Sequence, residues 1–290
     1  MDPIGSVAHG LTLAPPVAER VGRDGRLELA FERRGLATVL RRSRSTLPLQ
    51  VLAPLALPDP AAVVSILNPT GGLVGGDRLV IDVDVGAQAH ACLTTPSATR
   101  VYRALGPAAE QHIRLTIGPG ATLEWMPDHT IPHAGAALRQ RIDVELADSA
   151  RLILVDAFAA GRVARGEAWR FGRLESTISV RDCRGWLVHD RFVVTGDSGW
   201  GGLGYTEGHP YFATVVVVGD SDWDVFRREA GDVLRARPDV RGGAGVLARG
   251  GCMVRLLGAS APALLGAVDA LWALGRQSLL GLPPLALRKL

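Results

Sequence analysis

Three segments of the chain share one design: a strand, a short turn that ends in alanine, and a second strand. The first strands, 81–85, 113–117 and 142–146, send Ile, Val or Leu to one side and polar or charged residues to the other. The closing alanines, at 89, 121 and 150, recur about every 30 residues. Such a period is typical of coiled or stacked β structures, in which each unit covers a face of its neighbour. Any antiparallel protein also contains strand-turn-strand units, so both arrangements stay open.

Strand patterns also occur outside this repeat. Alternating residues predict one hairpin over 27–41 and another over 174–194. Tyr211–Val218 is an apolar β-branched strand, and Cys252–Leu257 is a shorter one. The 35 glycines favour many turns and short strands over long helices.

Two helices are predicted, both after residue 220. Ser221 could cap the first, because Asp224 completes a capping-box pattern before an apolar stripe. Ser260 could cap the second, with Pro262 in the first turn, where a missing N–H costs little.

The predicted fold class is mainly β, with stacked antiparallel sheets of solenoid-like or flattened-barrel character and two helices in the C-terminal half. Residues 1–22 carry Gly, Pro and Ala without a clear period, and we expect a loosely ordered tail there. Residues 23–290 are then a single β-rich domain. The content of 47% hydrophobic and 21% charged residues is that of a folded protein.

Composition and charge exclude several classes of protein. A net charge of +3 is too small to imply nucleic acid. Cys92, Cys183 and Cys252 are odd in number and widely spaced, which argues against a disulfide framework or zinc knuckle and for a reducing compartment. No signal peptide is evident, and no apolar run reaches the ~18 residues of a membrane span. We therefore expect a cytoplasmic protein without a membrane or nucleic-acid partner.

The densest glycine motif is NPTGGLVGGDRL at 68–79, between two strand-like segments. Its four glycines, Gly71, Gly72, Gly75 and Gly76, precede Asp77 and Arg78. Asp77 stands where a phosphate-binding loop needs lysine, so a nucleotide site is not indicated. Glycine permits positive φ and close backbone approach. We expect these residues, with Tyr102 and Arg103 of the segment 94–103, to form an interaction loop that is structural first and functional second. A tight β connection and a polar turn are the plain alternatives.

Catalytic patterns are weak. His129 and His133 follow Asp128, but Pro127 and Pro132 prevent a helix, and residues four apart in a strand are roughly 13 Å apart. A metal-dependent hydrolase that uses Asp128, His129 and His133 nevertheless stays an alternative. No nucleophile, base and orienting group assemble by spacing.

Four motifs together resemble the UreD (UreH) family of urease accessory proteins. They are NPTGGLVGGDRL, the TTPSATRVYR segment with Tyr102 and Arg103, GPGATLEWMPDHTI at 118–131, and GRVARGE at 161–167. The resemblance extends to the closing helix and the LGLPPLALRKL tail. It implies a β-rich fold of stacked sheets with two helices and no catalytic activity. It also implies binding to apo-urease and to UreF, which recruits UreG, and passage of nickel through an internal channel.

A nickel path needs oxygen or imidazole donors that release the ion, because Ni²⁺ ranks high among divalent metals in site affinity. Interior carboxylates with water would serve, and no tightly bound cofactor is expected. We predict that the path uses five carboxylates: Asp77, Asp82, Asp84, Glu124 and Glu167. Each could instead be a solvated or salt-bridged strand residue. A metal-free β-solenoid binding module is a further alternative.

Overall fold

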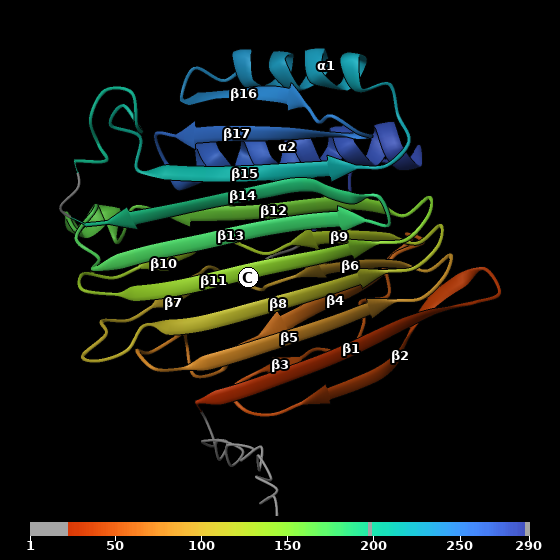
Figure 1. The fold of residues 1–290 in the computed structure, drawn as a ribbon, viewed down its shortest axis with the longest axis horizontal. Coiled ribbons are helices and arrows are strands. Elements are labelled where there is room, and N and C mark those ends of the chain that lie inside the picture. Colours follow the sequence, from red (N-terminus) through yellow and green to blue (C-terminus); the bar gives the residue numbers. More distant parts are fainter. Residues whose placement is uncertain (1–22, 197–198, 288–290) are drawn as a thin grey trace, which may run out of the picture.

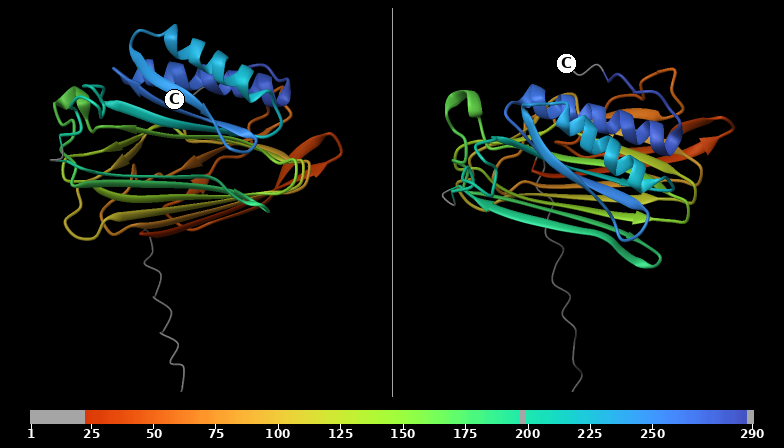
Figure 2. Two further views of the ribbon diagram at one scale, coloured as in Figure 1. Left: turned by 45° about the horizontal axis from the view of Figure 1, so that its top comes forward. Right: turned by 90° about the horizontal axis from the view of Figure 1, so that it is seen from above.

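The structure is a computed structural model that describes residues 23–196 and 199–287. Two stacked sheets form the body of the molecule, and two helices lie against one of them (Figures 1 and 2). The seven-stranded sheet contains, in spatial order, β14 (Gly185–Thr195), β13 (Arg173–Asp182), β11 (Ala137–Leu146), β8 (Ala109–Ile117), β5 (Arg78–Val85), β1 (Asp24–Arg34) and β2 (Ala37–Ser45).

The ten-stranded sheet lies opposite. Its main path is β16 (Val240–Val246), β17 (Gly251–Gly258), β15 (Tyr211–Val218), β12 (Arg151–Ala159), β9 (Thr122–Met126), β6 (His90–Thr94), β4 (Ala62–Leu67) and β3 (Gln50–Val51). β10 (Thr130–Pro132) pairs with β12 and with β7 (Thr99–Val101) beside this path. The helices are α1 (Trp223–Arg235) and α2 (Ala261–Leu280), with a 3₁₀ turn at Val163–Arg165.

The repeat is a set of coils. β5, β8 and β11 lie side by side in one sheet, and the strands that follow their turns, β6, β9 and β12, lie side by side in the other. Equivalent residues pair in register, as Ile81 with Ile113 and Ile113 with Ile142. The mainly β, stacked and solenoid-like fold with two late helices is confirmed.

The prediction of antiparallel sheets is wrong for the centre of both sheets. β1, β5, β8, β11 and β13 are mutually parallel, as are β4, β6, β9 and β12. The chain returns to a sheet only after a complete coil, which supplies the long crossover that a parallel pair requires. Antiparallel pairs occur toward the margins, at β1–β2, β3–β4 and β13–β14, and from β12 through β15 and β17 to β16. Alternation within a strand gives its faces but not its partner's direction.

The three alanine turns are built alike. The residue before each alanine, Gln88, Gly120 or Ser149, has a left-handed φ of 60°, 63° or 56°. Each alanine then donates its N–H to the carbonyl three residues earlier and is itself buried. A larger side chain would face the closed end of the coil, so alanine at this position is explained by packing.

Two apolar layers hold the fold together. One lies between the sheets, and the other lies between the ten-stranded sheet and the helices. Ser260 caps α2 as predicted, accepting from Ala263 N. α1 is capped by Asp222 rather than Ser221, because the helix begins one residue later and the Asp222 side chain accepts from Val225 N.

Some sequence expectations lie outside these elements. The predicted tail at 1–22 lies outside the described residues. Within 23–196 and 199–287, no helix is long and apolar enough to cross a membrane.

The turn geometry predicts that Ser149→Gly will stabilise the protein. A left-handed backbone conformation is costly for a residue with a Cβ, and replacement by glycine removes that cost. Glycine also raises the entropy of the unfolded chain, which offsets part of the gain in stability. We expect a net gain of about 0.5 kcal/mol in the free energy of unfolding, measured by urea denaturation. Ala147→Gly, in the same turn but without positive φ, is the control and should lower stability. A loss of stability in Ser149→Gly would contradict this account of the turns.

Candidate functional site

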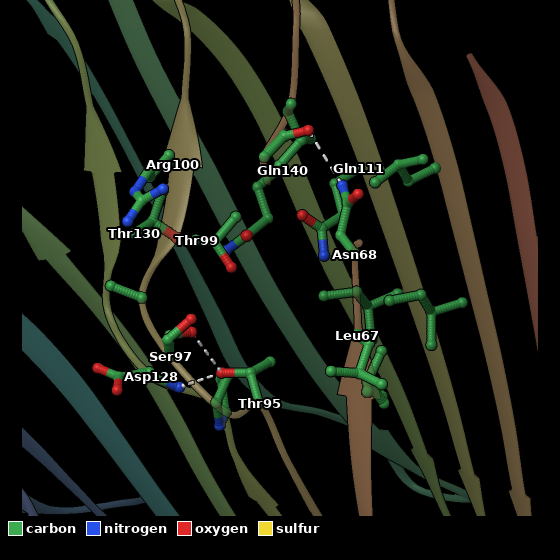
Figure 3. A pocket seen from close by; sticks show the side chains of 18 of the residues that line it. Leu67, Asn68, Thr95, Ser97, Thr99, Arg100, Gln111, Asp128, Thr130 and Gln140 are labelled. Atoms are coloured by element: carbon green, nitrogen blue, oxygen red, sulfur yellow. Dashed lines mark hydrogen bonds between the residues drawn. The ribbon is translucent and has the colours of Figure 1, made fainter. Parts of the chain in front are cut away.

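A cavity of about 280 Å³ opens between the two sheets near the glycine motif (Figure 3). Its walls carry apolar side chains from both sheets, including Ile113, Ile142 and Trp125. Its polar side chains come from several loops and strands and include Asn68, Thr95, Ser97, Thr99, Arg100, Asp128, Thr130 and Gln140. The cavity thus combines an apolar frame with amide, hydroxyl and carboxylate oxygens.

Asp156, on β12, is the carboxylate at the inner side of this cavity. It is buried, and its oxygens accept hydrogen bonds from Gln140 Nε2 and Ser176 Oγ, each at 2.7 Å. Loss of hydration raises the pKa of Asp156 to about 6; the two hydrogen bonds oppose this shift, and the nearby charge of Asp190 adds to it. The carboxyl of Asp156 therefore takes up and releases a proton closer to neutral pH than an exposed aspartate does.

A second hollow, of about 410 Å³, is lined by residues that include Asp156, Phe192 and Arg255. Asp156 is the one described residue that lines both spaces, so the two hollows come near each other at this side chain. Trp125, which lines the first space, and Trp200, which lines the second, each have a buried indole N–H with no hydrogen-bond partner among the described residues. Buried donors of this kind pair with water or with a ligand oxygen. The interior is therefore suited to hydrated polar contents.

The glycine motif forms part of the cavity wall. A Cβ on Gly72, whose φ is 153°, would lie 2.3 Å from Arg100 O, and one on Gly75 would lie 2.9 Å from Ala104 Cα. Gly71 and Gly76 have φ values of 87° and 82°. These contacts require glycine and explain the demanding path that the sequence indicated.

Other residues of the predicted interaction loop support this path. Asp77 Oδ2 accepts from Val74 N at 2.8 Å, and Asp77 Oδ1 lies 3.4 Å from Arg23 Nε. Tyr102 Oη donates to Gly71 O at 3.3 Å, and Arg78 lies on the outside, 3.8 Å from Glu110. The Arg103 side chain packs close to Gly135. The loop is thus internally constrained, and its role in partner binding stays a prediction.

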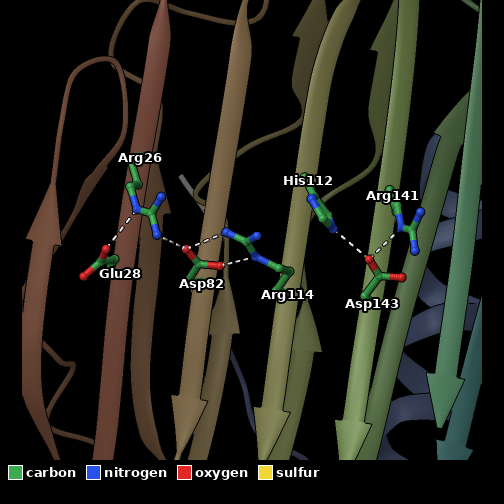
Figure 4. Close-up of polar contacts among 7 residues, drawn as sticks. All are labelled: Arg26, Glu28, Asp82, His112, Arg114, Arg141 and Asp143. Carbon is green, nitrogen blue, oxygen red and sulfur yellow. Dashed lines mark hydrogen bonds and ion pairs between the residues drawn. The ribbon is translucent and has the colours of Figure 1, made fainter. Parts of the chain in front are cut away.

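The five predicted carboxylates do not come together. Asp82 lies on the outer face of the seven-stranded sheet, where it pairs with Arg26 and Arg114 (Figure 4). Asp84 lies two residues further along β5 and is exposed. Glu167 accepts hydrogen bonds from two guanidinium nitrogens of Arg162, Nε and Nη2, and these bonds lower the pKa of Glu167. An interior position is found for Asp77 and Glu124 alone of the five.

The outer face of the seven-stranded sheet carries a ladder of opposite charges. Parallel strands bring Asp82 opposite Arg114, and Asp143 accepts from His112 and Arg141 (Figure 4). Parallel sheets are usually covered on both faces. Here the outer face of the seven-stranded sheet carries paired charges in register, which make it suited to contact with water.

Glu124 belongs to a buried network beneath α2. Its side chain has no exposed surface and contacts His90 Nε2 at 2.6 Å, Trp272 Nε1 at 2.5 Å and Arg276 Nη1 at 2.5 Å. Arg276 also pairs with Asp59 and donates to Pro283 O. Burial raises the pKa of Glu124, but His90 and Arg276 outweigh burial and hold that pKa below its ordinary value. The network thus joins α2 and the segment that follows it, at Pro283, to strands β6 and β9 of the coils.

The histidine pair does not form a metal centre with its neighbours. His129 Nδ1 lies 2.7 Å from Asp128 Oδ1, whereas the His133 ring stands edge-on to Tyr102 at 4.9 Å. In the described ranges, no group of three or more His, Cys, Asp or Glu residues could hold a metal ion. The hydrolase alternative therefore gains no support from the geometry.

Sequence reasoning missed Asp156, Gln140 and Ser176. The signal for Asp156 was present, since it is the one charged residue inside the apolar run LILVDAFAA. Arg276 carried a similar signal within the apolar helix α2. Gln140 and Ser176 become recognisable only when the coils are placed in register.

Comparison with known proteins decides the family. A family model described as UreD urease accessory protein matches residues 23–289. This chain belongs to the UreD family. Proteins named urease accessory protein UreD are 37% identical in Deinococcus radiodurans, over 96% of this chain and 99% of that protein, and 35% identical in Alkalilimnicola ehrlichii, over 93% and 92%. One from Pseudomonas aeruginosa is 37% identical over 88% and 90%. The UreD resemblance inferred from the motifs is confirmed, and with it a role in urease maturation.

The burial of Asp156 predicts a pH-dependent effect of Asp156→Asn. Between about pH 4 and pH 6 the folded protein retains a proton that the unfolded carboxyl has lost, so this group lowers stability as pH rises through that window. Asparagine avoids the buried charge. We expect the variant to gain up to about 3 kcal/mol at pH 8 and little at pH 4. The free energy of unfolding is measured by urea denaturation between pH 4 and pH 8, with Asp84→Asn, at an exposed carboxylate, as the control. A gain in stability of Asp156→Asn that does not change with pH would contradict the raised pKa of Asp156.

The Glu124 network predicts a marked loss of stability on removal of one partner. Arg276→Met leaves a buried carboxylate without its cation, which costs about 3–5 kcal/mol in the free energy of unfolding. The double variant Glu124→Gln, Arg276→Met should recover part of that loss, because no charge is left unpaired. A double-mutant cycle by chemical denaturation measures the coupling, and strictly additive losses would contradict it.

Proposed function

We propose that this UreD-family protein is a urease maturation scaffold that binds apo-urease and UreF, with UreG recruited through UreF. It conducts nickel through its interior toward the urease active site. It acts without turnover of its own and without a tightly bound cofactor, since nickel is its cargo. Within the described residues the three cysteines form no disulfide, which supports a reducing, cytoplasmic setting.

The observation that carries nickel conduction is the pair of hollows that meet at Asp156. A cargo ion needs ligands that bind and release it, and a closed thiolate or imidazole site would retain Ni²⁺. The cavity offers dispersed hydroxyl, amide and carboxylate oxygens instead. Trp125 and Trp200, which line the two hollows, each have an indole N–H without a partner among the described residues, where a water that accompanies the ion could bind.

Asp156 is better suited to this task than the five carboxylates that the sequence indicated. Four of those have a cationic partner: Asp77 has Arg23, Asp82 has Arg114, Glu124 has Arg276 and Glu167 has Arg162. The side-chain hydrogen-bond donors to Asp156 are a neutral amide, from Gln140, and a neutral hydroxyl, from Ser176. A divalent cation would relieve the cost of burying its charge. A nickel role for Asp77, Asp82, Asp84, Glu124 and Glu167 stays a proposal of lower rank.

The test is urease activation in cells that carry the urease operon with this gene deleted or restored. Restoring the gene should restore urease activity. Asp156→Leu should lower the nickel content of purified urease by about tenfold, because it places an apolar side chain between the hollows. Glu145→Leu, at an exposed carboxylate of β11 that is not among the proposed nickel residues, is the control and should leave nickel loading unchanged. Metal analysis of urease and co-purification with UreF are measured on the same cultures.

The outcomes separate the functions. Activation that does not depend on the gene would reject the maturation role. Fully nickel-loaded urease with Asp156→Leu, in a complex that still contains UreF, would reject conduction through Asp156. That second result would favour the alternative of a metal-free β-solenoid binding module. Replacing Cys92, Cys183 and Cys252 by serine should leave activation intact.

A further inference from the structure

The second hollow is a groove at the open side of the two stacked sheets, which we name the seam groove. It is lined by residues of β14 from one sheet and of β15, β16 and β17 from the other, together with residues of the loop around 200–206. β14 and β16 are the terminal strands of their sheets. The groove therefore lies where the stack of coils ends and two strand edges are unpaired.

The floor of the groove is aromatic. Phe158 stacks on Phe212 at 5.4 Å and meets Phe192 edge-on at 5.3 Å, and Trp169 stacks on Phe212 at 6.3 Å. Tyr205, in the lining loop, is 60% exposed, and the neighbouring Leu203 is 91% exposed. Exposed aromatic and aliphatic side chains beside an apolar groove mark a surface for a partner's apolar residue.

Arginines surround this floor. Arg191 pairs with Glu175, and Arg255 of β17 reaches across to Asp190 of β14. Arg241, on the terminal strand β16, is exposed and has no ion pair within the described ranges. Positive charge in excess of its partners, next to an apolar floor, is complementary to a segment that is both acidic and apolar.

The arginines also bear on nickel conduction. A cation that leaves Asp156 through this groove meets guanidinium groups that repel it. Carboxylates from a partner would neutralise these guanidinium groups. A partner carboxylate that pairs with Arg255 would replace Asp190 in that ion pair, which leaves the Asp190 carboxylate available near Asp156. The proposed conduction thus requires an acidic partner at this point.

We propose that the seam groove receives an acidic, apolar segment of a partner protein, with an apolar side chain on the aromatic floor and carboxylates on Arg241 and Arg255. The proposal rests on the maturation function and assigns it a docking surface. The glycines of β16, at 242, 243 and 245, leave its edge open to backbone approach. The segment can therefore lie extended along this edge.

The experiment measures binding of the full chain to purified UreF and, separately, to purified apo-urease. Arg241→Glu and Tyr205→Ala should each weaken binding of the same partner by about tenfold. The Arg241→Glu effect should shrink at high salt, because exposed charges are screened. Arg42→Glu is the matched control: an exposed arginine on β2, at the opposite end of the seven-stranded sheet. Thermal unfolding confirms that each variant is folded, and Arg241→Gln repeats the test with a milder change.

Binding of both partners within about twofold of the parent by Arg241→Glu, Arg241→Gln and Tyr205→Ala would overturn the proposal. A change confined to self-association, measured by sedimentation, would overturn it as well, since the occupant would then be a second copy of the chain. Failure of the maturation function is seen separately, as urease activation that persists when the gene is deleted.

Discussion

In-register stacking of the coils is the constraint on which the structure depends. Because Ile81, Ile113 and Ile142 occupy equivalent positions, each coil presents the same apolar face inward and the same charged face outward. The backbone bonds between coils and the left-handed position before each alanine hold that register. The outer charge ladder follows from this register, and so does the part of the cavity wall that the equivalent residues Ile81, Ile113 and Ile142 form.

The interior is not filled for stability alone. Asp156, Gln140 and Ser176 occupy inward-facing positions that apolar residues would fill at lower cost. The Glu124 network is a different use of buried charge, because its carboxylate is matched by Arg276 and further donors. The carboxylate of Glu124 is therefore matched by a cation and joins α2 to the coils, whereas Asp156 has neutral hydrogen-bond donors as its partners. Their contrast separates a structural charge from a candidate functional one.

The sequence predicted the repeat, the alanine turns, the two helices and the constrained glycine loop, because each depends on local residue patterns. It did not predict parallel pairing, which depends on how far the chain travels before returning. Asp82 alternates with Ile81 and Val83, and that alternation places it on the solvent face. Glu124 and Asp156 interrupt apolar strands instead, which is the better sign of an interior carboxylate. The partners of Asp156 come from other coils and could not be assigned without the register.

The coiled construction also fixes the length of the molecule in equal steps. Its length along the stack, from β2 to β14, grows in steps of one strand spacing, about 4.8 Å. Gain or loss of a whole coil would change the separation of the two ends by one such step and leave every inward and outward position unchanged. A loop insertion outside the strands would change neither. The spacing between surfaces at opposite ends is thus set by a whole number of coils, independently of the residues that line the path between them.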